Sequence, residues 1–434
     1  MIMDARTTAL SVLIACRRQG AWSDGALKEY ITRDRLSRKD AALATRLCYG
    51  VQQNKLLLDY WIGLFLKQSP QKLQPVVLDI LRLGTYQLRF MDRIPAFSVV
   101  DEAVKQTKKY ANPKAAGLTN AVLRAMLREP GRLSLPEELS LRYSHPQALV
   151  DLLRENVSEE LLEPLLASHN EIPPICLQVN TRKTDREQVM TGLTAEGFSC
   201  EPHSWLSDAV LTKGDIEHST AFREGLVFVQ DASANLAVRC AAPQPGTRVL
   251  DCCAAPGGKS FAAALLMEDR GELISCDLYP HKLRLIDRGR ERLGLQLPAT
   301  RVQDAAAANP EWRDRFDLVI ADVPCSGLGV IRKKPDIREK DLHTAEALPE
   351  LQARILEQQA EYVKPGGLLL YSTCTILKRE NEGITDAFLE SHPEFRRESL
   401  PLPEGMDGTG GQITLLPCVH GTDGFYICKF RRLT

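Results

Sequence analysis

Three short stretches of the sequence place cysteine beside residues that could assist its chemistry. Residues 251–260 read DCCAAPGGKS, residues 322–327 read DVPCSG, and residues 371–375 read YSTCT. A cysteine thiolate is a strong nucleophile and a metal ligand, and a nearby cation favours the thiolate over the thiol. Glycine lets a ligand approach the backbone closely. The first stretch therefore raises three possibilities: a site for a nucleoside triphosphate, for a metal or for another ligand.

The pattern of the first stretch argues against a nucleoside triphosphate and against a metal. A phosphate-binding P-loop needs Gly, four residues and then Gly-Lys-Ser/Thr, and Cys253 stands where that first glycine belongs. Pro256 also removes a backbone N–H that would contact phosphate. The chain has twelve cysteines, but no two of them form a Cys-x-x-Cys pair, so we expect no metal site.

Short apolar strands alternate with amphipathic helices from residue 247 onward, which predicts a parallel, doubly wound α/β sheet. Strands are expected at 248–253, 272–276, 316–321 and 368–372, and helices at 261–267, 281–293 and 351–363. Ligands of such sheets bind beyond the carboxyl ends of the strands. Cys325 and Cys374 each follow a predicted strand, so we expect both thiols at one rim of the sheet.

The cofactor that fits this rim is S-adenosylmethionine. Gly257 and Gly258 lie in the loop before the predicted helix and let a ligand approach the backbone closely, and the N-terminus of that helix favours a carboxylate such as that of S-adenosylmethionine. Asp277 ends the second strand, where it can accept hydrogen bonds from both ribose hydroxyls. A nicotinamide dinucleotide would use the same acid, but its Gly-x-Gly-x-x-Gly loop is absent. A further strand, between those at 272–276 and 316–321, is expected to end near Asp304, which would contact the adenine amino group.

A methyl donor beside two thiols indicates methylation of a weak nucleophile. Cytosine C5 is such a carbon, and a thiolate that adds to C6 turns the ring into an enamine that C5 can use to attack a methyl group. Asp322 could then hydrogen-bond the N3/N4 edge of the base, and Lys259 could favour the thiolate or pair with Asp322. Spacing leaves open which of Cys325 and Cys374 is the nucleophile.

The rest of the chain predicts a multidomain protein that binds a polyanion. Residues 1–130 have helical periodicity and hold 21 Lys and Arg against 11 Asp and Glu, whereas the remainder is acidic. We expect an all-α domain over 1–143, a small α+β linking domain over 144–232 and an α/β Rossmann-like catalytic domain over 233–434. No apolar run reaches the roughly 18 residues of a membrane helix, and scattered thiols are typical of the cytoplasm.

Several motifs closely resemble the RNA cytosine-5 methyltransferases related to the Nol1/Nop2/Sun proteins. They are the loop at 253–259, Pro324-Cys325, Thr373-Cys374, Asn381-Glu382 and 423–425. Residues 93–95, 102–104 and 119–124 resemble the helical domain shared with the transcription factor NusB, and 142–146 the start of the linking domain. This combination is similar to the branch of the family that methylates bacterial 16S ribosomal RNA.

The resemblance implies a role for each site residue. Cys374 would be the nucleophile, Cys325 would assist product release and Asp322 would be a further catalytic residue. S-adenosylmethionine would be bound by Cys253, Ala254, Ala255, Pro256, Gly257, Gly258, Lys259, Asp277, Asp304 and Asp322.

The target cytosine must leave its stack to reach the thiol and the methyl group. We expect Arg332, Lys333 and Lys334, which follow Cys325 closely, to contact phosphates around it, and the basic N-terminal domain to add salt-dependent affinity. The expected partner is 16S ribosomal RNA. We expect the protein to be a monomer and not to associate with a membrane. Two alternatives stay open: a transfer RNA methyltransferase, and a non-catalytic RNA-binding antitermination or assembly factor.

Overall fold

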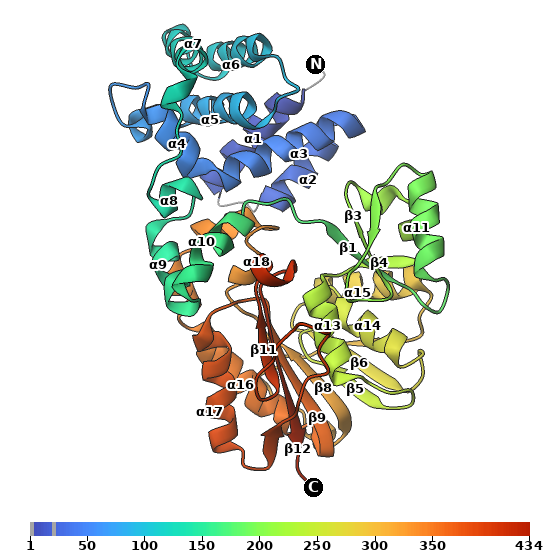
Figure 1. Cartoon of the computed structure of the whole chain (residues 1–434). Coiled ribbons are helices and arrows are strands. Elements are labelled where there is room, and N and C mark those ends of the chain that lie inside the picture. Colours follow the sequence, from blue (N-terminus) through green and yellow to red (C-terminus); the bar gives the residue numbers. More distant parts are fainter. Residues whose placement is uncertain (1–3, 20–22) are drawn as a thin grey trace. The chain divides into compact units, whose positions relative to one another are not determined.

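The computed structural model describes residues 4–19 and 23–434 (Figure 1). Its first part is helical, as expected from the apolar periodicity. The helices are α1 Ala5–Gln19, α2 Ser23–Asp34, α3 Arg38–Gln53, α4 Lys55–Gly63, α5 Pro75–Phe90, α6 Ala96–Tyr110, α7 Pro113–Arg128, α8 Leu139–Arg142, α9 Gln147–Asn156 and α10 Glu159–Ser168. Pro75 and Pro113 occupy the first position of their helices, where a missing N–H costs no hydrogen bond.

The remainder alternates strands and helices. The strands are β1 Ile175–Val179, β2 Cys200–Pro202, β3 Ala209–Thr212, β4 Val227–Val229, β5 Arg248–Asp251, β6 Glu272–Asp277, β7 Ala299–Val302, β8 Phe316–Asp322, β9 Val363–Thr373, β10 Phe395–Arg397, β11 Gln412–Leu415 and β12 Phe425–Arg432. The helices are α11 Arg186–Ala195, α12 Thr220–Arg223, α13 Ala232–Ala241, α14 Gly258–Leu266, α15 Pro280–Leu293, α16 Leu348–Ala360, α17 Glu382–Ser391 and α18 Pro417–His420.

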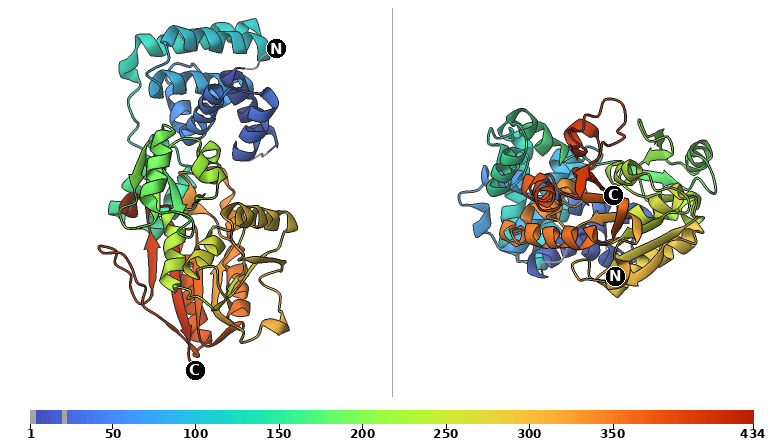
Figure 2. Two further views of the ribbon diagram at one scale, coloured as in Figure 1. Left: turned by 90° about the vertical axis from the view of Figure 1, so that its right-hand side faces the viewer. Right: turned by 90° about the horizontal axis from the view of Figure 1, so that it is seen from below.

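The large sheet has helices on both faces. Its order is β10-β12-β9-β8-β5-β6-β7, with β11 paired to β12, and β5 to β9 run parallel. Neighbouring residues of β5 face opposite layers: Val249 packs with α13, α14 and α15, and Leu250 with α16 and α17. The view from below in Figure 2 shows α16 and α17, in orange, to one side of the strands. This confirms the doubly wound α/β sheet, although β10, β11 and β12 add an antiparallel edge that the sequence did not predict.

A second, smaller sheet is antiparallel in the order β2-β3-β1-β4. Leu177 of β1 and Val210 of β3 are fully buried, and they pack with Val189 and Leu193 of α11. This α+β arrangement confirms the fold expected of the linking segment. No described helix is long and apolar enough to cross a membrane.

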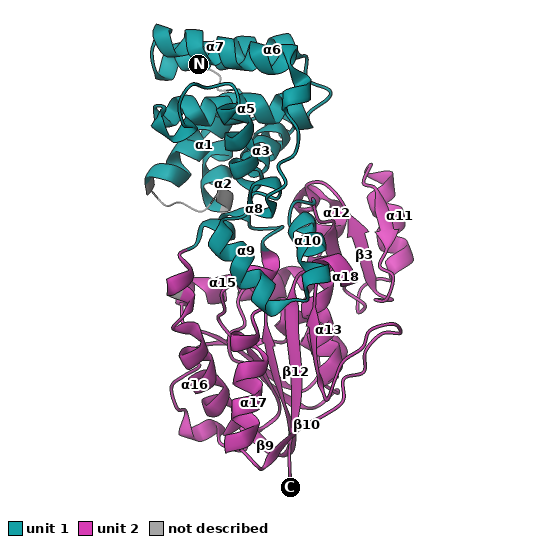
Figure 3. Ribbon diagram, turned by 60° about the vertical axis from the view of Figure 1, so that its left-hand side comes forward, with its two compact units in different colours: residues 1–171, 331–340 teal, residues 172–330, 341–434 magenta. Residues whose placement is uncertain are grey.

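The chain divides into two compact units (Figure 3). The first comprises residues 1–171 together with 331–340, and the second comprises 172–330 together with 341–434. A ten-residue segment within the C-terminal half thus belongs to the helical unit. The units divide after Glu171, and the predicted domain boundaries after residues 143 and 232 stay predictions.

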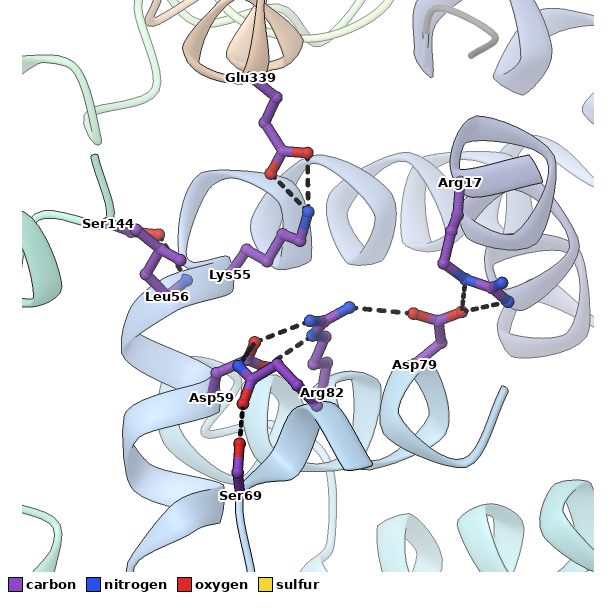
Figure 4. A network of polar contacts seen from close by, with 10 residues as sticks. Arg17, Lys55, Leu56, Asp59, Ser69, Asp79, Arg82, Ser144 and Glu339 are labelled. Carbon is purple, nitrogen blue, oxygen red and sulfur yellow. Dashed lines mark hydrogen bonds and ion pairs between the residues drawn. The ribbon is translucent and has the colours of Figure 1, made fainter. Parts of the chain in front are cut away.

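Three charged side chains, Asp59, Asp79 and Arg82, are buried together in the helical unit, where they pair with one another (Figure 4). Arg82 lies 2.7 Å from Asp59 and 3.1 Å from Asp79, and Asp79 also pairs with Arg17 at 3.1 Å. Asp59, Asp79 and Arg82 are each less than a tenth exposed. Burial lowers the pKa of Arg82, but the two carboxylates outweigh it and the net pKa is raised, so the guanidinium stays charged.

Candidate active site

The carboxyl ends of three neighbouring strands form the rim of the site. β9, β8 and β5 are adjacent in the sheet and parallel, and they end at Thr373, Asp322 and Asp251. The loops that follow them therefore start at the same edge. The three cysteine-containing stretches come together there.

Two thiols meet at this rim. The Sγ atoms of Cys325 and Cys374 lie 3.2 Å apart, and both residues are half-buried. The hydrogen bond to Cys374, with burial, raises the pKa of Cys325 well above its ordinary value. Either sulfur can be the donor in this contact, and the raised pKa of Cys325 means that a proton is available there to donate toward Cys374.

A lysine–aspartate ion pair lies beside the thiols. Lys259 Nζ is 2.6 Å from Asp322 Oδ2, and the other carboxylate oxygen accepts a hydrogen bond from Ser372 at 2.8 Å. Burial lowers the pKa of Lys259, but the charge of Asp322, with smaller contributions from Asp251 and Cys374, outweighs it, so the net pKa is raised. The ammonium thus stays charged within electrostatic range of Cys374. The ion pair that the sequence offered as one role of Lys259 is present.

Buried polar side chains hold the two cysteine loops in place. The carboxylate of Glu380, which is fully buried, accepts hydrogen bonds from the Ser326 N–H and from Gln352, both at 2.9 Å. The hydroxyls of Ser326 and Thr375 lie 2.8 Å apart and join one loop to the other.

These supporting residues were only partly found from the sequence. Asn381 was singled out as a family position, and its side chain binds Thr373 at 2.6 Å and the Thr375 carbonyl at 3.1 Å. Glu380 and Gln352 were missed. An acid directly before the motif at Asn381 was the one available signal for Glu380.

The loop at 253–259 leads from β5 into α14 and forms a cradle. Gly257 has φ +113°, and a Cβ there would lie 2.6 Å from the Phe261 ring. α14 begins at Gly258 with no side-chain cap, so its first N–H groups face the loop. Of the predicted cofactor residues in this loop, Ala254 and Gly257 are buried, Cys253, Ala255, Gly258 and Lys259 half-buried, and Pro256 exposed.

The two further acids follow the neighbouring strands, as expected. Asp277 ends β6, is nearly buried and accepts a hydrogen bond from the Tyr279 N–H at 3.1 Å. Asp304 lies two residues beyond β7, is exposed and caps the turn at Ala306. Both lie along the same carboxyl edge of the sheet as Asp251.

Asp251 is a buried acid that the sequence reading did not assign. One oxygen accepts a hydrogen bond from Ser260 at 2.7 Å, and the other has no partner among the described residues. Burial raises its pKa to about 7, although the hydrogen bond from Ser260 lowers it. The pKa of this carboxyl is higher in the folded than in the unfolded protein. Its protonated form therefore stabilises the fold fully below the unfolded pKa, and this stabilisation is lost as the pH rises through the folded pKa.

We expect Asp251→Asn to become more stable than the wild type as pH rises. The stabilisation from the protonated acid is lost between about pH 4, the unfolded pKa, and about pH 7, whereas asparagine stays neutral and still accepts from Ser260. Thermal denaturation of both proteins across this range should show the variant's Tm gaining several degrees, at roughly 3 °C per kcal/mol. A difference in Tm that does not change with pH would contradict the shifted pKa.

The three basic residues expected to contact RNA lie in different environments. Arg332 is 5% exposed, Lys333 is half-buried and Lys334 is exposed. The Arg332 carbonyl accepts from Gln53 at 3.4 Å within the helical unit. Only Lys334 presents its side chain fully to solvent. No group of three or more His, Cys, Asp or Glu side chains among the described residues could hold a metal.

Comparison with known proteins identifies all three parts of the chain. Residues 238–431 match the model of the family described as 16S rRNA methyltransferase RsmB/F, residues 3–128 match the NusB family, and residues 145–217 match the ferredoxin-like domain of RsmF/B-like methyltransferases. The crystal structure of PH0851 has a TM-score of 0.80 at 27% identity and covers 98% of both chains.

Two curated relatives cover nearly the whole length. The probable ribosomal RNA small subunit methyltransferase B of Bacillus subtilis is 38% identical over 98% of both chains. The ribosomal RNA small subunit methyltransferase B of Vibrio cholerae is 35% identical over 94% of this chain and 96% of its own. The chain therefore belongs to the ribosomal RNA small subunit methyltransferase B family.

Proposed function

We propose that this protein transfers a methyl group from S-adenosylmethionine to C5 of a cytosine in 16S ribosomal RNA, through a covalent bond to Cys374. The observation that carries the proposal is the pair of thiols 3.2 Å apart beside the ion pair of Lys259 and Asp322. An amine acceptor would need no thiol, whereas cytosine C5 needs one. The relatives named for small-subunit ribosomal RNA support the choice of substrate.

The cradle fits S-adenosylmethionine. The uncapped N-terminus of α14 suits its carboxylate. The Nε2 of Gln230, a buried donor beside Gly258, has no partner among the described residues and would find one in a bound ligand. Asp277 would take the ribose hydroxyls and Asp304 the adenine amino group. When bound there, S-adenosylmethionine supplies a methyl group on a positively charged sulfur.

Cys374 begins the reaction on the base. Its thiolate adds to C6, one S–C bond forms, and the electrons of the C5–C6 double bond become available at C5 for the methyl group. Asp322 accepts a hydrogen bond from the cytosine amino group and stabilises the adduct, and Lys259 stabilises the thiolate before attack.

Cys325 assists release of the product. After methylation a base takes the C5 proton, the double bond re-forms and the S–C6 bond breaks, returning the electrons to Cys374. The leaving sulfur is then a thiolate, and the protonated Cys325 donates a hydrogen bond to it. The short Sγ–Sγ distance supports this role.

RNA would be held by both parts of the chain. We propose that Lys333 and Lys334 contact phosphates near the flipped base, with the buried Arg332 contributing charge rather than direct contact. The helical domain, proposed to span 1–143, would add salt-dependent affinity, and the linking domain at 144–232 would join it to the catalytic domain at 233–434. The protein would act as a monomer in the cytoplasm.

Labelling of unmodified 16S ribosomal RNA tests the proposal. With methyl-labelled S-adenosylmethionine we expect labelled 5-methylcytosine at one position of this RNA. The measurement is to map that position. RNA affinity should fall steeply with salt, because phosphate contacts release counterions. Label in transfer RNA alone would favour that alternative substrate, and no label in any RNA would favour the non-catalytic factor.

A further inference from the structure

The segment at 331–340 leaves the catalytic loop and joins the helical unit. Cys325 is followed by a short turn that ends at Val330, and the next residue already belongs to the first unit, coloured teal in Figure 3. The chain returns to the second unit after Lys340. Ten residues that follow a catalytic cysteine so closely thus pack with the other unit, and this packing needs a physical reason.

Arg338 fastens this segment into the helical unit. Its Nη1 donates to the carbonyls of Gln53 at 2.7 Å and of Tyr143 and Ser144 at 3.2 Å each. Its Nη2 donates to the His169 carbonyl at 2.8 Å and to the Asn170 side chain at 2.7 Å. These five acceptors come from three separate parts of the unit. One side chain therefore joins the end of α3, the turn before α9 and the end of α10.

The receiving pocket accepts a guanidinium specifically. Arg338 is 3% exposed, and its five acceptors are four carbonyls and an amide oxygen. Burial lowers its pKa to about 9. The planar fork of arginine reaches acceptors in several directions, which a lysine ammonium cannot do from one position.

The turn at 143–145 is shaped to present its carbonyls. Ser144 has φ +57°, a conformation that non-glycine residues rarely adopt, and its hydroxyl accepts a hydrogen bond from the Leu56 N–H at 2.9 Å. His145, fully buried, binds the Tyr143 carbonyl at 2.7 Å and the His169 ring at 3.0 Å. The 142–146 motif, which the proposed reaction does not use, thus forms the acceptor side of the Arg338 pocket.

The residues just before this segment are hydrogen-bonded to the backbone of Cys374. The N–H of Gly329 donates to the Cys374 carbonyl at 3.0 Å, and the Gly329 carbonyl accepts from Gly424 at 2.8 Å. A Cβ on Gly329 would lie 1.9 Å from the Gly424 carbonyl oxygen, so no larger residue fits. Eight residues therefore separate Gly329, which is hydrogen-bonded to Cys374, from the anchor at Arg338.

We propose that Arg338 is a positioning residue that holds the Cys325 loop against Cys374 by anchoring the segment after it in the helical unit. The helical unit then contributes to the chemical step and not only to RNA affinity. The inference rests on the proposed methyl transfer, because its readout is the rate of that reaction.

A matched pair of insertions tests the tether without touching Arg338. Two glycines between Val330 and Ile331 leave every Arg338 hydrogen bond possible but slacken its connection to the loop. We expect kcat to fall about 100-fold, because small displacements near reacting groups are costly, with the affinities for S-adenosylmethionine and RNA unchanged within experimental error. The same insertion between Lys340 and Asp341, on the return crossing, should leave kcat close to wild type.

Substitution of the anchor provides a second, independent test. Arg338→Ala should lower kcat with KM for RNA little changed, Arg338→Lys should not restore it, and added guanidinium should restore it in part. Glu339→Gln is the matched control, since Glu339 pairs with Lys55, as drawn in Figure 4, and contributes no hydrogen bond to the Arg338 pocket. Circular dichroism of each variant shows whether it folds.

The outcomes separate the possibilities. Full kcat in the Val330–Ile331 insertion would overturn the proposal, since the bonds of Ser326 and Gly329 would then suffice to hold the loop. Equal losses of kcat from the two insertions would also overturn the proposal. If Arg338→Ala fails to fold, the insertions still decide. A wild-type protein that methylates no RNA would instead refute the proposed function.

Discussion

Cys374→Ala should abolish methyl transfer, whereas Cys325→Ala should leave the enzyme covalently attached to its RNA. Without the Cys374 thiolate no addition to C6 takes place, and loss of a catalytic nucleophile lowers kcat on the order of 10⁴- to 10⁶-fold. Without Cys325 the addition still occurs, but the leaving sulfur has lost its hydrogen-bond donor 3.2 Å away. Denaturing gel electrophoresis with labelled 16S RNA measures the adduct.

The controls make the assignment of the two thiols decisive. The double variant, which lacks both thiols, should form no adduct, because the covalent bond to RNA needs Cys374. Cys200→Ala, a half-buried thiol in β2, should keep the wild-type rate within about twofold. An adduct retained by Cys374→Ala but lost from Cys325→Ala would reverse the two roles.

The position of the reactive groups could be predicted because it depends on strand ends alone. Cys325, Cys374 and Asp322 each follow or end a short apolar strand, and parallel strands present their carboxyl ends at one edge. Lys259 lies in the first turn of α14, the helix that follows β5, which brings it to the same edge. For these residues, local periodicity was sufficient to place side chains that are far apart in the sequence.

The supporting contacts depend on packing that periodicity does not reveal. Arg338 binds Asn170, which is 168 residues away, and Glu380 joins Ser326 to α16 through Gln352. A charge run at 332–338 suggests a solvated or RNA-binding surface, yet Arg332 and Arg338 are both buried. Whether an arginine is buried depends on acceptors elsewhere in the fold, and these carbonyls carry no sequence signal.

The antiparallel edge was missed for a related reason. β12 pairs with β9 over six residues, from Tyr426 with Thr373 to Arg431 with Leu368. Its glycine and polar neighbours at 421–424 indicate only a turn before it, and a single strand carries no information about its direction in the sheet. The pairing matters for the site, because it places Gly424 where it binds Gly329.

Breaking the Lys259–Asp322 pair from its two sides should shift the pH dependence of the reaction in opposite directions. Lys259→Met removes a cation near Cys374 and leaves the Asp322 charge uncompensated, so the thiolate forms only at higher pH. Asp322→Asn removes the anion and leaves the ammonium, so the thiolate forms at lower pH. Each shift should be about one pH unit.

The rate at the pH plateau distinguishes the two side chains further. Asp322→Asn should lower plateau kcat by about 10²- to 10³-fold, because the adduct loses a preorganised hydrogen-bond acceptor. Lys259→Met should recover most of its activity at high pH, provided that S-adenosylmethionine is saturating. Profiles of kcat against pH for both single variants and the double variant are the measurement. Because the double variant has neither charge, its profile should lie between those of the single variants. Shifts of the same sign in both would mean that the pair acts by holding the loops rather than through its charge on the Cys374 thiol.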